Sequence, residues 1–524
     1  MSLLNSKKSA KEASPGPISE IDYANHTFLF RSPKISDLLF VLFGILLAIL
    51  VALGINFTAT YPSFLIVGAA LALILAFIIF QKPELGAYIL IFTVFTNLSD
   101  LFTEKGLPSI NKPLVGIVLF SIFANYILRT GKINSSVKMT RVEVALLAYY
   151  LAILASSLVA INQSRALNSV FDLTKDIAVG FCIYFTLDTK EKLKTGARIL
   201  LIAVTFVSIL GIIHTLSSSN ISFGGLAQQS AFGQTSDTGD LRYGGPIGES
   251  NIWGQVLVSI LPIALYRIAR EREPLAKMLV ALSALCILIA MFFTESRGAF
   301  VALVVILALI AIDLRIKGTT LLALTSIGLV LLFIVPSRYT ERIKSLDIFF
   351  QPNQEYGLSQ DESVQGRREK MLTGLAMFRD NPFLGVGFAN YTDNYWSYAG
   401  NLGLEAAARN VGSESSERQP HSLYIEVMAE TGIFGITTFL AFLGLMLNGL
   451  YQARVKNNAN KIKADKDWSA WITSIMMSII TFLVAGFFLH GIGFRFIWVL
   501  AGLAIAIVHL TQNQSSILPS KLDS

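Results

Sequence analysis

Apolar runs of about 20 residues recur along this chain from Asp37 to Leu510, separated by short polar links. A run of that length is what an α-helix needs to cross the hydrocarbon core of a bilayer. About fourteen runs fit, and about twelve fit if one pair is misread, most easily at the short run Leu85 to Leu98. Hydrophobic residues make up 53% of the 524 positions and charged residues only 15%. The pattern therefore predicts an all-α, polytopic membrane bundle.

The charges predict how the bundle is oriented. Basic residues cluster in the N-terminal segment and then in every second link, and by the positive-inside rule these parts face the cytoplasm, as do both termini. The basic clusters include Lys7, Lys8 and Lys11; Arg129, Lys132 and Lys138; Lys190, Lys192 and Lys194; Arg267, Arg270 and Arg272; and Lys456, Lys461 and Lys463. Because the net charge of +7 is spread over these links, it does not indicate a nucleic-acid partner.

Two of the remaining, outward links are large. One runs from about Ser217 to Asn251, and the other, at 336–420, is long enough to hold a small subdomain. The expected organisation is a cytoplasmic tail (1–36), a set of transmembrane helices (37–216), a region with the polar motifs (217–435), further transmembrane helices (436–510) and a second cytoplasmic tail (511–524). Residues 1–36 lack a cleavage site, so the first run is expected to be a retained helix.

Four polar groups on the outward side are candidates for a functional site. In the first, Arg242 precedes a Gly-rich stretch that ends at Asn251, where a helix is expected to begin. In the second, Glu295 and Arg297 share a link so short that both must lie at the membrane surface. Each also has a simpler interpretation: a flexible loop for the first, and a surface ion pair or a snorkelling Arg for the second.

The other two groups lie at the two ends of the larger loop's second half. Arg367 and Arg368 begin a stretch with helical spacing that stops at Asn381-Pro382, although an ordinary solvated helix has the same pattern. His421 stands where the loop re-enters the membrane, ahead of Glu426 and Glu430. Because two carboxylates are costly in lipid, the span itself is expected to start near Gly432.

Several arginines and one histidine on one face indicate recognition of a phosphate-bearing lipid head group, most simply a diphosphate. Arg pairs with phosphate oxygens in a bidentate way and keeps its charge, and a His near its usual pKa can accept a proton from a hydroxyl. The outward loops have no Asp-rich metal motif and the chain has no Walker-type phosphate loop. We therefore expect no metal, no cofactor and no ATP-driven step.

The order of these motifs resembles the O-antigen ligase and polymerase superfamily. The matching sequences are an Arg-Gly-rich loop ending in Asn, then T-E-S-R-G-A, then G-R and a helix that ends in N-P-F-L-G-V-G, then H-S-L-Y and E-T-G-I-F-G. The resemblance covers about Arg242 to Gly435. Val301, Met371 and Glu249 depart from the residues that relatives carry, but none of these changes removes a cationic or proton-transferring group.

The resemblance implies a metal-independent, inverting glycosyltransferase on a GT-C-like scaffold in the bacterial inner membrane. Its partners would be an undecaprenyl-diphosphate-linked glycan as donor and lipid A core, a glycan or another acceptor at the periplasmic face. Such enzymes build lipopolysaccharide and exopolysaccharide. Carried over by motif, the catalytic residues are His421 and Arg297, and the diphosphate-binding residues are Arg242, Arg367, Arg368 and Asn251. The supporting residues are Glu295, Glu426, Glu430 and Gly432, the last matching a His and a Gly separated by ten residues.

Three functions stay open at this point. A ligase and a Wzy-type polymerase use the same donor and differ in the acceptor. A bicarbonate or other anion transporter would instead place ionisable residues near the bilayer midplane. The candidates for that role are Asp172, Lys175, Asp176 and His214, but no second half of the sequence matches them.

Overall fold

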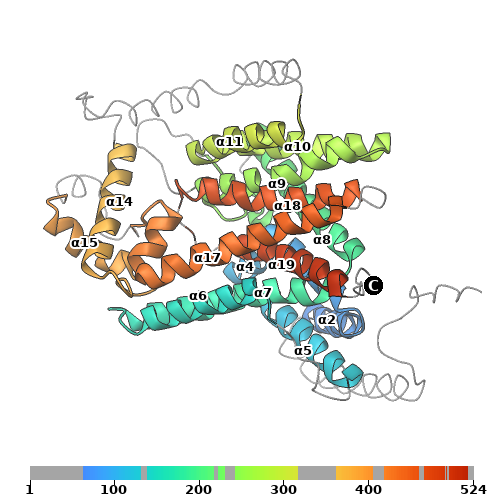
Figure 1. The fold of residues 1–524 in the computed structure, drawn as a ribbon, viewed down its shortest axis with the longest axis horizontal. Coiled ribbons are helices and arrows are strands. Elements are labelled where there is room, and N and C mark those ends of the chain that lie inside the picture. Colours follow the sequence, from blue (N-terminus) through green and yellow to red (C-terminus); the bar gives the residue numbers. More distant parts are fainter. Residues whose placement is uncertain are drawn as a thin grey trace, which may run out of the picture. The chain divides into compact units, whose positions relative to one another are not determined.

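The structure, a computed structural model, describes residues 63–130, 139–217, 222–230, 242–316, 362–404, 418–459, 465–489, 491 and 495–516 (Figure 1). Residues 1–77 and 78–524 form two compact units, and the contacts reported below lie within the second. The helices are α2 (Ser63–Gln81), α3 (Pro83–Phe95), α4 (Leu98–Glu104), α5 (Asn111–Thr130), α6 (Arg141–Ser157), α7 (Gln163–Thr186), α8 (Lys190–Leu216), α9 (Ser250–Arg270), α10 (Pro274–Phe293), α11 (Arg297–Asp313), α14 (Glu362–Asp380), α15 (Tyr391–Asn401), α17 (Leu423–Ala459), α18 (Lys466–Ala485) and α19 (Arg495–Ser516).

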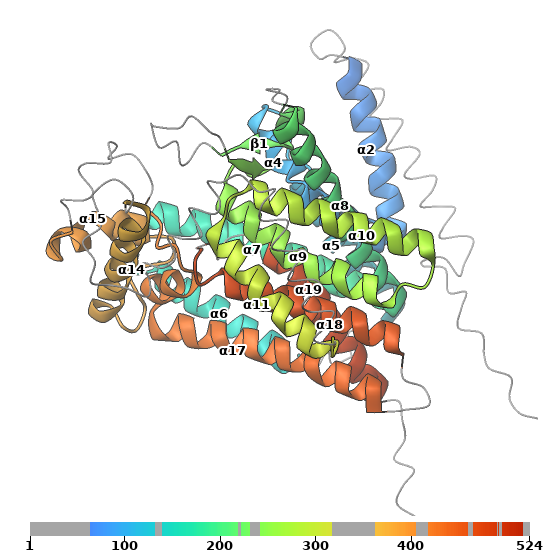
Figure 2. The ribbon, with the colours of Figure 1, turned by 90° about the horizontal axis from the view of Figure 1, so that it is seen from above.

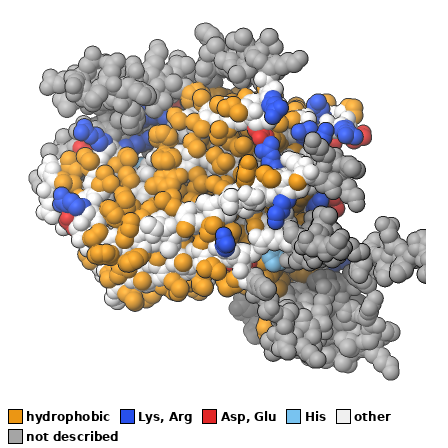
Figure 3. All heavy atoms as spheres, in the orientation of Figure 1, with side chains coloured by type: hydrophobic (Ala, Val, Ile, Leu, Met, Phe, Trp, Pro, Cys, Tyr) orange, Lys and Arg blue, Asp and Glu red, His pale blue; other side chains and the backbone are white. Residues whose placement is uncertain are grey.

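The predicted all-α membrane bundle is confirmed. Within the described ranges, six helices are long and apolar enough to cross a membrane: α8, α9, α10, α17, α18 and the segment of α19 up to Gln512. Large hydrophobic side chains are exposed on the bundle, among them Leu151, Ile202, Leu279 and Val304. Figure 3 shows such side chains covering the middle of the visible face, as expected of a surface in contact with lipid. Apolar runs in 37–62 and 317–336 lie outside the described residues.

The short run from Leu85 to Leu98 is not one helix. α3 and α4 meet at an angle of 64°, and Asn97 between them has a φ of 52°. The Asn97 amide donates to the carbonyl oxygen of Pro246 at 2.9 Å, so it holds the loop that follows Arg242. Asn97 is thus the residue at which the helix breaks within this short run.

α9 and α18 form the centre of the bundle. Every residue of α9 from Ile252 to Ala264 is buried, which is typical of a helix with neighbours on all sides. Gly254 lets the α10–α11 link and the start of α11 approach closely, because a Cβ there would lie 2.8 Å from the Thr294 hydroxyl oxygen and 3.2 Å from the Ala299 Cβ. On the other side, Gln255 Nε2 donates to the carbonyl oxygen of Phe482 in α18 at 3.1 Å.

One end of this bundle, the site end, contains the first residues of α9, α11 and α17 and the turn Gly486–Phe488 after α18. Gly298 at the start of α11 packs against Phe488, since a Cβ there would lie 2.9 Å from the Phe488 Cβ. The backbone N–H of Leu423, the first residue of α17, donates to the carbonyl oxygen of Gly486 at 2.8 Å. Helices from distant parts of the chain therefore begin around a single turn.

At the opposite end, three of the links with basic residues meet. Lys194 forms an ion pair with Asp467 at 3.1 Å, and Arg267 pairs with both Asp467 and Glu271, the latter at 2.6 Å. Arg267 also lies over the Trp471 ring, 4.7 Å from its centroid. The links with clustered positive charge thus gather away from the site end.

α14 and α15 form a small unit beside α17 and the end of α6, which we call the loop subdomain (Figure 2). It has its own core, made of Met377, Val386, Tyr391, Tyr395, Ala399 and Ala429. The turn between its helices touches the α6–α7 link: the Asn390 side chain accepts from the backbone N–H of Asn162 at 2.7 Å. The ion pair of Arg165 with Asp393, at 3.4 Å, adds a second contact.

Residues 222–230 and 242–249 cover the start of α9. They contain a 3-10 turn, Phe223–Gly225, and two antiparallel strands, β1 (Gln228–Gln229) and β2 (Tyr243–Gly245). The buried Tyr243 hydroxyl donates to the carbonyl oxygen of Val207 in α8 at 3.0 Å. Gly245, with a φ of 65°, lies against Trp253, where a Cβ would come within 2.4 Å of the ring.

Candidate functional site

Arg297 is the first residue of α11, and the surrounding T-E-S-R-G-A sequence explains how it is held. The Ser296 hydroxyl accepts from the backbone N–H of Ala299 at 3.4 Å and caps the helix. The Thr294 hydroxyl donates to the Met291 carbonyl oxygen at 2.7 Å, and Gly298 admits Phe488. Glu295 has a φ of 50°, which is rare outside Gly, Asn and Asp. A tight turn therefore sets Arg297, half-buried, at the site end.

His421 lies two residues before the first residue of α17. Its φ is 51°, a left-handed conformation that costs a non-glycine residue about 1 kcal/mol or more. The buried Pro420 precedes it, and the hydrogen bond from Leu423 to Gly486 follows it. These contacts thus hold the His421 backbone, and with it the imidazole, in a conformation that a histidine rarely adopts on its own.

The Gly486–Phe488 turn links the two predicted catalytic residues. Arg297 is next to Gly298, which packs on Phe488, and His421 is two residues from Leu423, which binds Gly486. Two motifs more than a hundred residues apart in the sequence therefore pack against the same turn.

A polar neighbour of His421 is a residue that the sequence analysis missed. Lys370 of α14 places its Nζ 3.2 Å from His421 Nε2. Burial, together with the nearby guanidinium groups of Arg418 and Arg367, lowers the pKa of Lys370 to about 8, although the Glu369 carboxylate acts in the opposite direction. The Tyr391 hydroxyl donates to the Lys370 carbonyl oxygen at 2.5 Å and fixes this turn of α14.

Arg418 is a second residue that the sequence analysis missed. Its guanidinium lies over the Trp396 ring, 5.5 Å from the centroid. Its buried Nε and Nη2 atoms have no hydrogen-bond acceptor among the residues that the structure describes. Buried guanidinium donors without an acceptor are costly unless a ligand completes them, and phosphate oxygens match their geometry.

Together, Arg367, Lys370, Arg418 and His421 give the loop subdomain a positively charged cluster with Glu369 as the nearby acid. One sequence signal was available: Lys370 follows Arg367 by three residues, so both lie on one face of the predicted helix. Arg368, one position away, is exposed and lies outside this cluster. In the described ranges, no three His, Cys, Asp or Glu side chains are grouped to hold a metal ion.

Glu426 and Glu430 hold the backbone around the site. Glu430 accepts from the backbone N–H groups of Ala389 at 2.9 Å and Tyr391 at 3.1 Å, and Glu426 accepts from Gly491 at 2.8 Å. Both side chains are buried. They therefore tie the loop subdomain and the α18–α19 link to the first turns of α17.

α17 breaks at Gly432, where we expected the membrane span to begin. Its φ is 63° and its ψ −161°, and a Cβ there would lie 2.3 Å from the Phe383 carbonyl oxygen. The break lets the N-P-F-L-G-V-G turn approach: Ile433 N–H donates to the Pro382 carbonyl oxygen at 2.7 Å, and Val386 N–H to that of Ala429 at 2.9 Å. The N-P-F-L-G-V-G turn and the E-T-G-I-F-G segment of α17 are thus joined by backbone hydrogen bonds.

Arg242 and Asn251 lie at the other side of the site end, around the start of α9. The Arg242 carbonyl oxygen accepts from Ser230 N–H at 2.7 Å, which continues the pairing of β1 with β2. The Asn251 side chain donates to Glu249 Oε1 at 3.3 Å, and the same oxygen accepts from its backbone N–H. These hydrogen bonds join neighbouring residues of the same loop.

The ionisable residues of α7 are engaged in ion pairs. Asp172 pairs with Lys175 one turn away, and Arg495 at the start of α19 binds Asp100 at 2.9 Å and Asp176 at 3.9 Å. His214 is buried in the last turn of α8. Arg495 thus joins α19 to α4 and α7, and the Asp172–Lys175 pair lies within α7.

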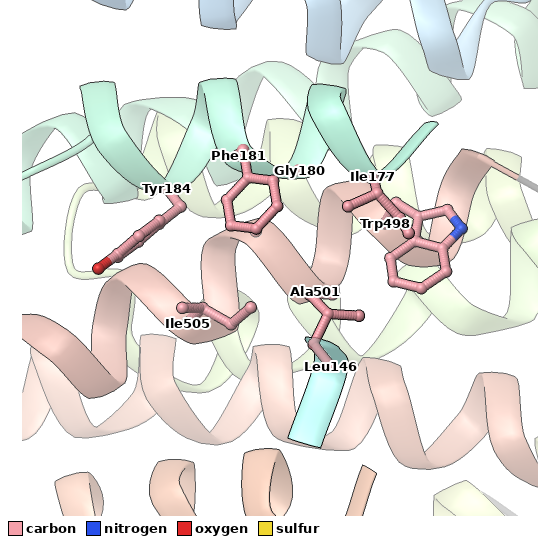
Figure 4. A pocket seen from close by; sticks show the side chains of 9 residues that line it. Leu146, Ile177, Gly180, Phe181, Tyr184, Trp498, Ala501 and Ile505 are labelled. Carbon is pink, nitrogen blue, oxygen red and sulfur yellow. The ribbon is translucent and has the colours of Figure 1, made fainter. Parts of the chain in front are cut away.

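A pocket between α6, α7 and α19 contains none of the candidate site residues (Figure 4). Its lining is apolar apart from the Tyr184 hydroxyl, which contacts His509 Nδ1 at 3.2 Å. Gly180 and Gly502 let the two helix backbones approach there. We therefore assign the pocket to helix packing.

Comparison with known protein families gives a match. Residues 282–440 match the O-antigen ligase family model, a range that holds Arg297, Arg367, Lys370, Arg418 and His421. No curated protein matches the chain. The resemblance drawn from the motifs is confirmed over this range: residues 282–440 of this multi-pass membrane protein match the O-antigen ligase family.

Proposed function

We propose that this protein transfers a glycan from undecaprenyl diphosphate to an acceptor hydroxyl at the periplasmic face of the bacterial inner membrane. The observation that carries the proposal is that the segments of Arg297 and His421, both within the range that matches the O-antigen ligase family, pack against the same Gly486–Phe488 turn. A fixed cation and an imidazole at the end of an apolar bundle suit a substrate with a lipid tail, a diphosphate and a reacting sugar.

In the proposed reaction, the acceptor oxygen bonds to the anomeric carbon as the bond from that carbon to the diphosphate oxygen breaks. The attack from the opposite face inverts the configuration. The acceptor's proton goes to His421, and the electron pair of the broken bond stays on the diphosphate. Arg297 and Arg367 stabilise this leaving group without a metal ion, because guanidinium groups already in position need no reorganisation when the charge develops.

The remaining residues would bind the rest of the donor. Arg242 and Asn251, in the glycine-rich cover of α9, would contact the sugar or the second phosphate. Arg418 offers two buried N–H groups to a phosphate oxygen. Exposed Arg368 would act on the donor only at long range.

The geometry supports a transferase over an anion transporter. The charged residues of α7 that a carrier would need are paired with Lys175 or Arg495. A ligase would use lipid A core as acceptor and a polymerase a second glycan, and either serves the synthesis of lipopolysaccharide or exopolysaccharide.

The test is transfer of a fluorescent glycan from undecaprenyl diphosphate by the purified protein, without ATP or added metal. The donor is isolated from cells that make the protein, and the acceptors offered are lipid A core and free glycan. We expect product with wild type, and a loss of at least about 10²-fold with His421→Ala and Arg297→Ala. The acceptor consumed decides between ligase and polymerase.

Matched controls are His509→Ala, at the other end of α19, and Arg379→Ala, whose side chain is 75% exposed and pairs with neighbouring Asp380. Both should keep wild-type rates. Wild type that forms no product with either acceptor, but carries bicarbonate into liposomes, would overturn the proposal in favour of transport.

A further inference from the structure

Lys370 contacts one of the two ring nitrogens of His421, the proposed base. Its Nζ lies 3.2 Å from His421 Nε2, and Nζ and Nε2 can share only one hydrogen along this contact. Whether Nζ or Nε2 donates this hydrogen therefore decides which tautomer His421 adopts. This argument rests on the proposed function, because it concerns how His421 acts in the transfer.

Two arrangements of the hydrogens are possible. If Lys370 is an ammonium, it donates to Nε2, and neutral His421 then carries its hydrogen on Nδ1 and has no free lone pair for a substrate proton. If Lys370 is a neutral amine, it accepts from Nε2–H, and Nδ1 is left with a lone pair. His421 can therefore act as a base from this position only while Lys370 is neutral.

The surroundings of Lys370 make the neutral amine accessible. Arg367 and Glu369 flank it on α14, Arg418 and His421 face it from the segment before α17, and Tyr391 faces it from α15. Two guanidinium groups and one carboxylate surround a largely buried amine. They therefore disfavour a positive charge on Lys370. The pKa of about 8 lies near the pH at which cells work.

We infer that Lys370 is the final proton acceptor in the transfer and that His421 relays the proton to it. The acceptor's O–H hydrogen moves to His421 Nδ1 while the Nε2 hydrogen moves to Lys370 Nζ. The freed oxygen bonds to the anomeric carbon, and the diphosphate leaves with the electron pair of the broken bond. Lys370 ends as an ammonium beside the leaving diphosphate, which gains one negative charge and becomes a trianion, and Lys370 returns its proton to water after the product departs.

Lys370 touches no reacting atom in this scheme, so it is a positioning residue that acts through His421. The rival role is a fixed cation that grips the diphosphate. Lys370→Arg separates the two roles, because Arg keeps the positive charge and does not give it up in proteins.

The first measurement follows the tautomer of His421 and needs no substrate. The full-length protein, labelled with 15N in its five histidines, is placed in lipid nanodiscs, and solid-state NMR is recorded from pH 6.5 to 9.5. The His421 signal is assigned from its absence in His421→Asn. We expect its hydrogen to move from Nδ1 to Nε2 as the pH passes about 8 in wild type, and to show no such move in Lys370→Arg or Lys370→Met.

The second measurement is the pH profile of transfer with the fluorescent undecaprenyl-diphosphate glycan. Wild-type kcat should rise to a plateau above about pH 8. Lys370→Arg should lower kcat by about 10² or more at every pH, with the donor KM nearly unchanged. Lys112→Met, which changes an exposed lysine of α5, is the matched control and should follow the wild-type profile.

Transfer by Lys370→Arg within a few-fold of wild type, with the same pH profile, would overturn the relay and leave Lys370 as a cation for the diphosphate. A His421 tautomer that stays constant with pH in wild type would overturn it as well. If wild type transfers no glycan but the tautomer switches and the switch depends on Lys370, the proposed function fails while the coupling of the two residues holds.

Discussion

The carboxylate of Glu430 accepts a hydrogen bond from the backbone N–H of Tyr391 at 3.1 Å, and so joins the first turns of α17 to the start of α15. Its other oxygen binds the N–H of Ala389 at 2.9 Å. The Glu430 carbonyl oxygen accepts from Ser156 Oγ of α6 at 2.6 Å. This residue therefore fixes the loop subdomain, and with it the charged cluster, against the bundle.

Replacing Glu430 should loosen that attachment. Glu430→Ala leaves two buried backbone N–H groups without an acceptor, at a cost of roughly 2–4 kcal/mol of unfolding free energy. Glu430→Gln keeps one acceptor oxygen and should lose about half as much. Thermal unfolding in detergent measures both changes. An Ala variant as stable as wild type would contradict this role, and Arg379→Ala on the exposed side of α14 is the control.

The break at Gly432 should tolerate no side chain. Gly432→Ala must place a Cβ 2.3 Å from the Phe383 carbonyl oxygen at a φ of 63°, so we expect a loss of more than about 3 kcal/mol and loss of transfer. Gly444→Ala in the same helix is the matched control. A Cβ there meets nothing within 4 Å, and Ala favours a helix over Gly by up to about 1 kcal/mol. Equal melting temperatures of the two variants would refute the steric argument.

These residues show how far sequence patterns reach. The helical spacing of Arg367, Met371 and Leu375 predicted α14, and the Asn-Pro pair after it predicted its end, because both are local properties of the chain. The apolar runs predicted the bundle for the same reason. Gly432 was singled out by a motif, but its reason, a close approach of the Phe383 carbonyl oxygen, needs the fold.

The pairing of Lys370 with His421 could not be predicted in this way. The two residues are 51 positions apart in the sequence, and their contact depends on α14 folding back onto the start of α17. The left-handed backbone of His421 is also a product of tertiary contacts, since no local signal favours it. The carboxylates of Glu426 and Glu430 were expected beside the site, yet their hydrogen bonds to backbone amides follow only from the folded loops.

Arg495 should stabilise the contact of α19 with α4 and α7. Arg495→Ala leaves Asp100 and Asp176 without their shared cation, and Asp176 is mostly buried, with a side chain 14% exposed. Because Arg495 itself is partly exposed, we expect a loss of about 1–3 kcal/mol rather than the larger cost of a fully buried pair. Asp176→Asn in the Arg495→Ala background should restore part of it. A double-mutant cycle by thermal unfolding measures the coupling, and additive losses would show that the ion pair contributes nothing.

The Lys370 side chain should lower the free energy of unfolding at the pH where the protein works. Its pKa is about 8 in the folded protein against 10.5 for a free lysine, a difference that corresponds to roughly 3 kcal/mol against the charged form. Between pH 8 and 10.5 the unfolded chain binds one proton more than the folded chain at this residue, so the contribution of Lys370 to stability rises with pH in that window. Below pH 8 Lys370 is protonated in both the folded and the unfolded chain, so the full loss of unfolding free energy is present.

Lys370→Met should therefore unfold at a higher temperature than wild type at pH 7, and the gap should shrink by pH 10, while Lys112→Met should show no gap at either pH. Thermal unfolding of the three proteins in one detergent measures this. A Met variant that is less stable than wild type at pH 7 would mean that the ammonium is favoured in the folded state, and the neutral amine that the relay requires would then be out of reach. A variant that is more stable yet unable to transfer glycan would show instead that the protein keeps a destabilising lysine because the reaction uses it.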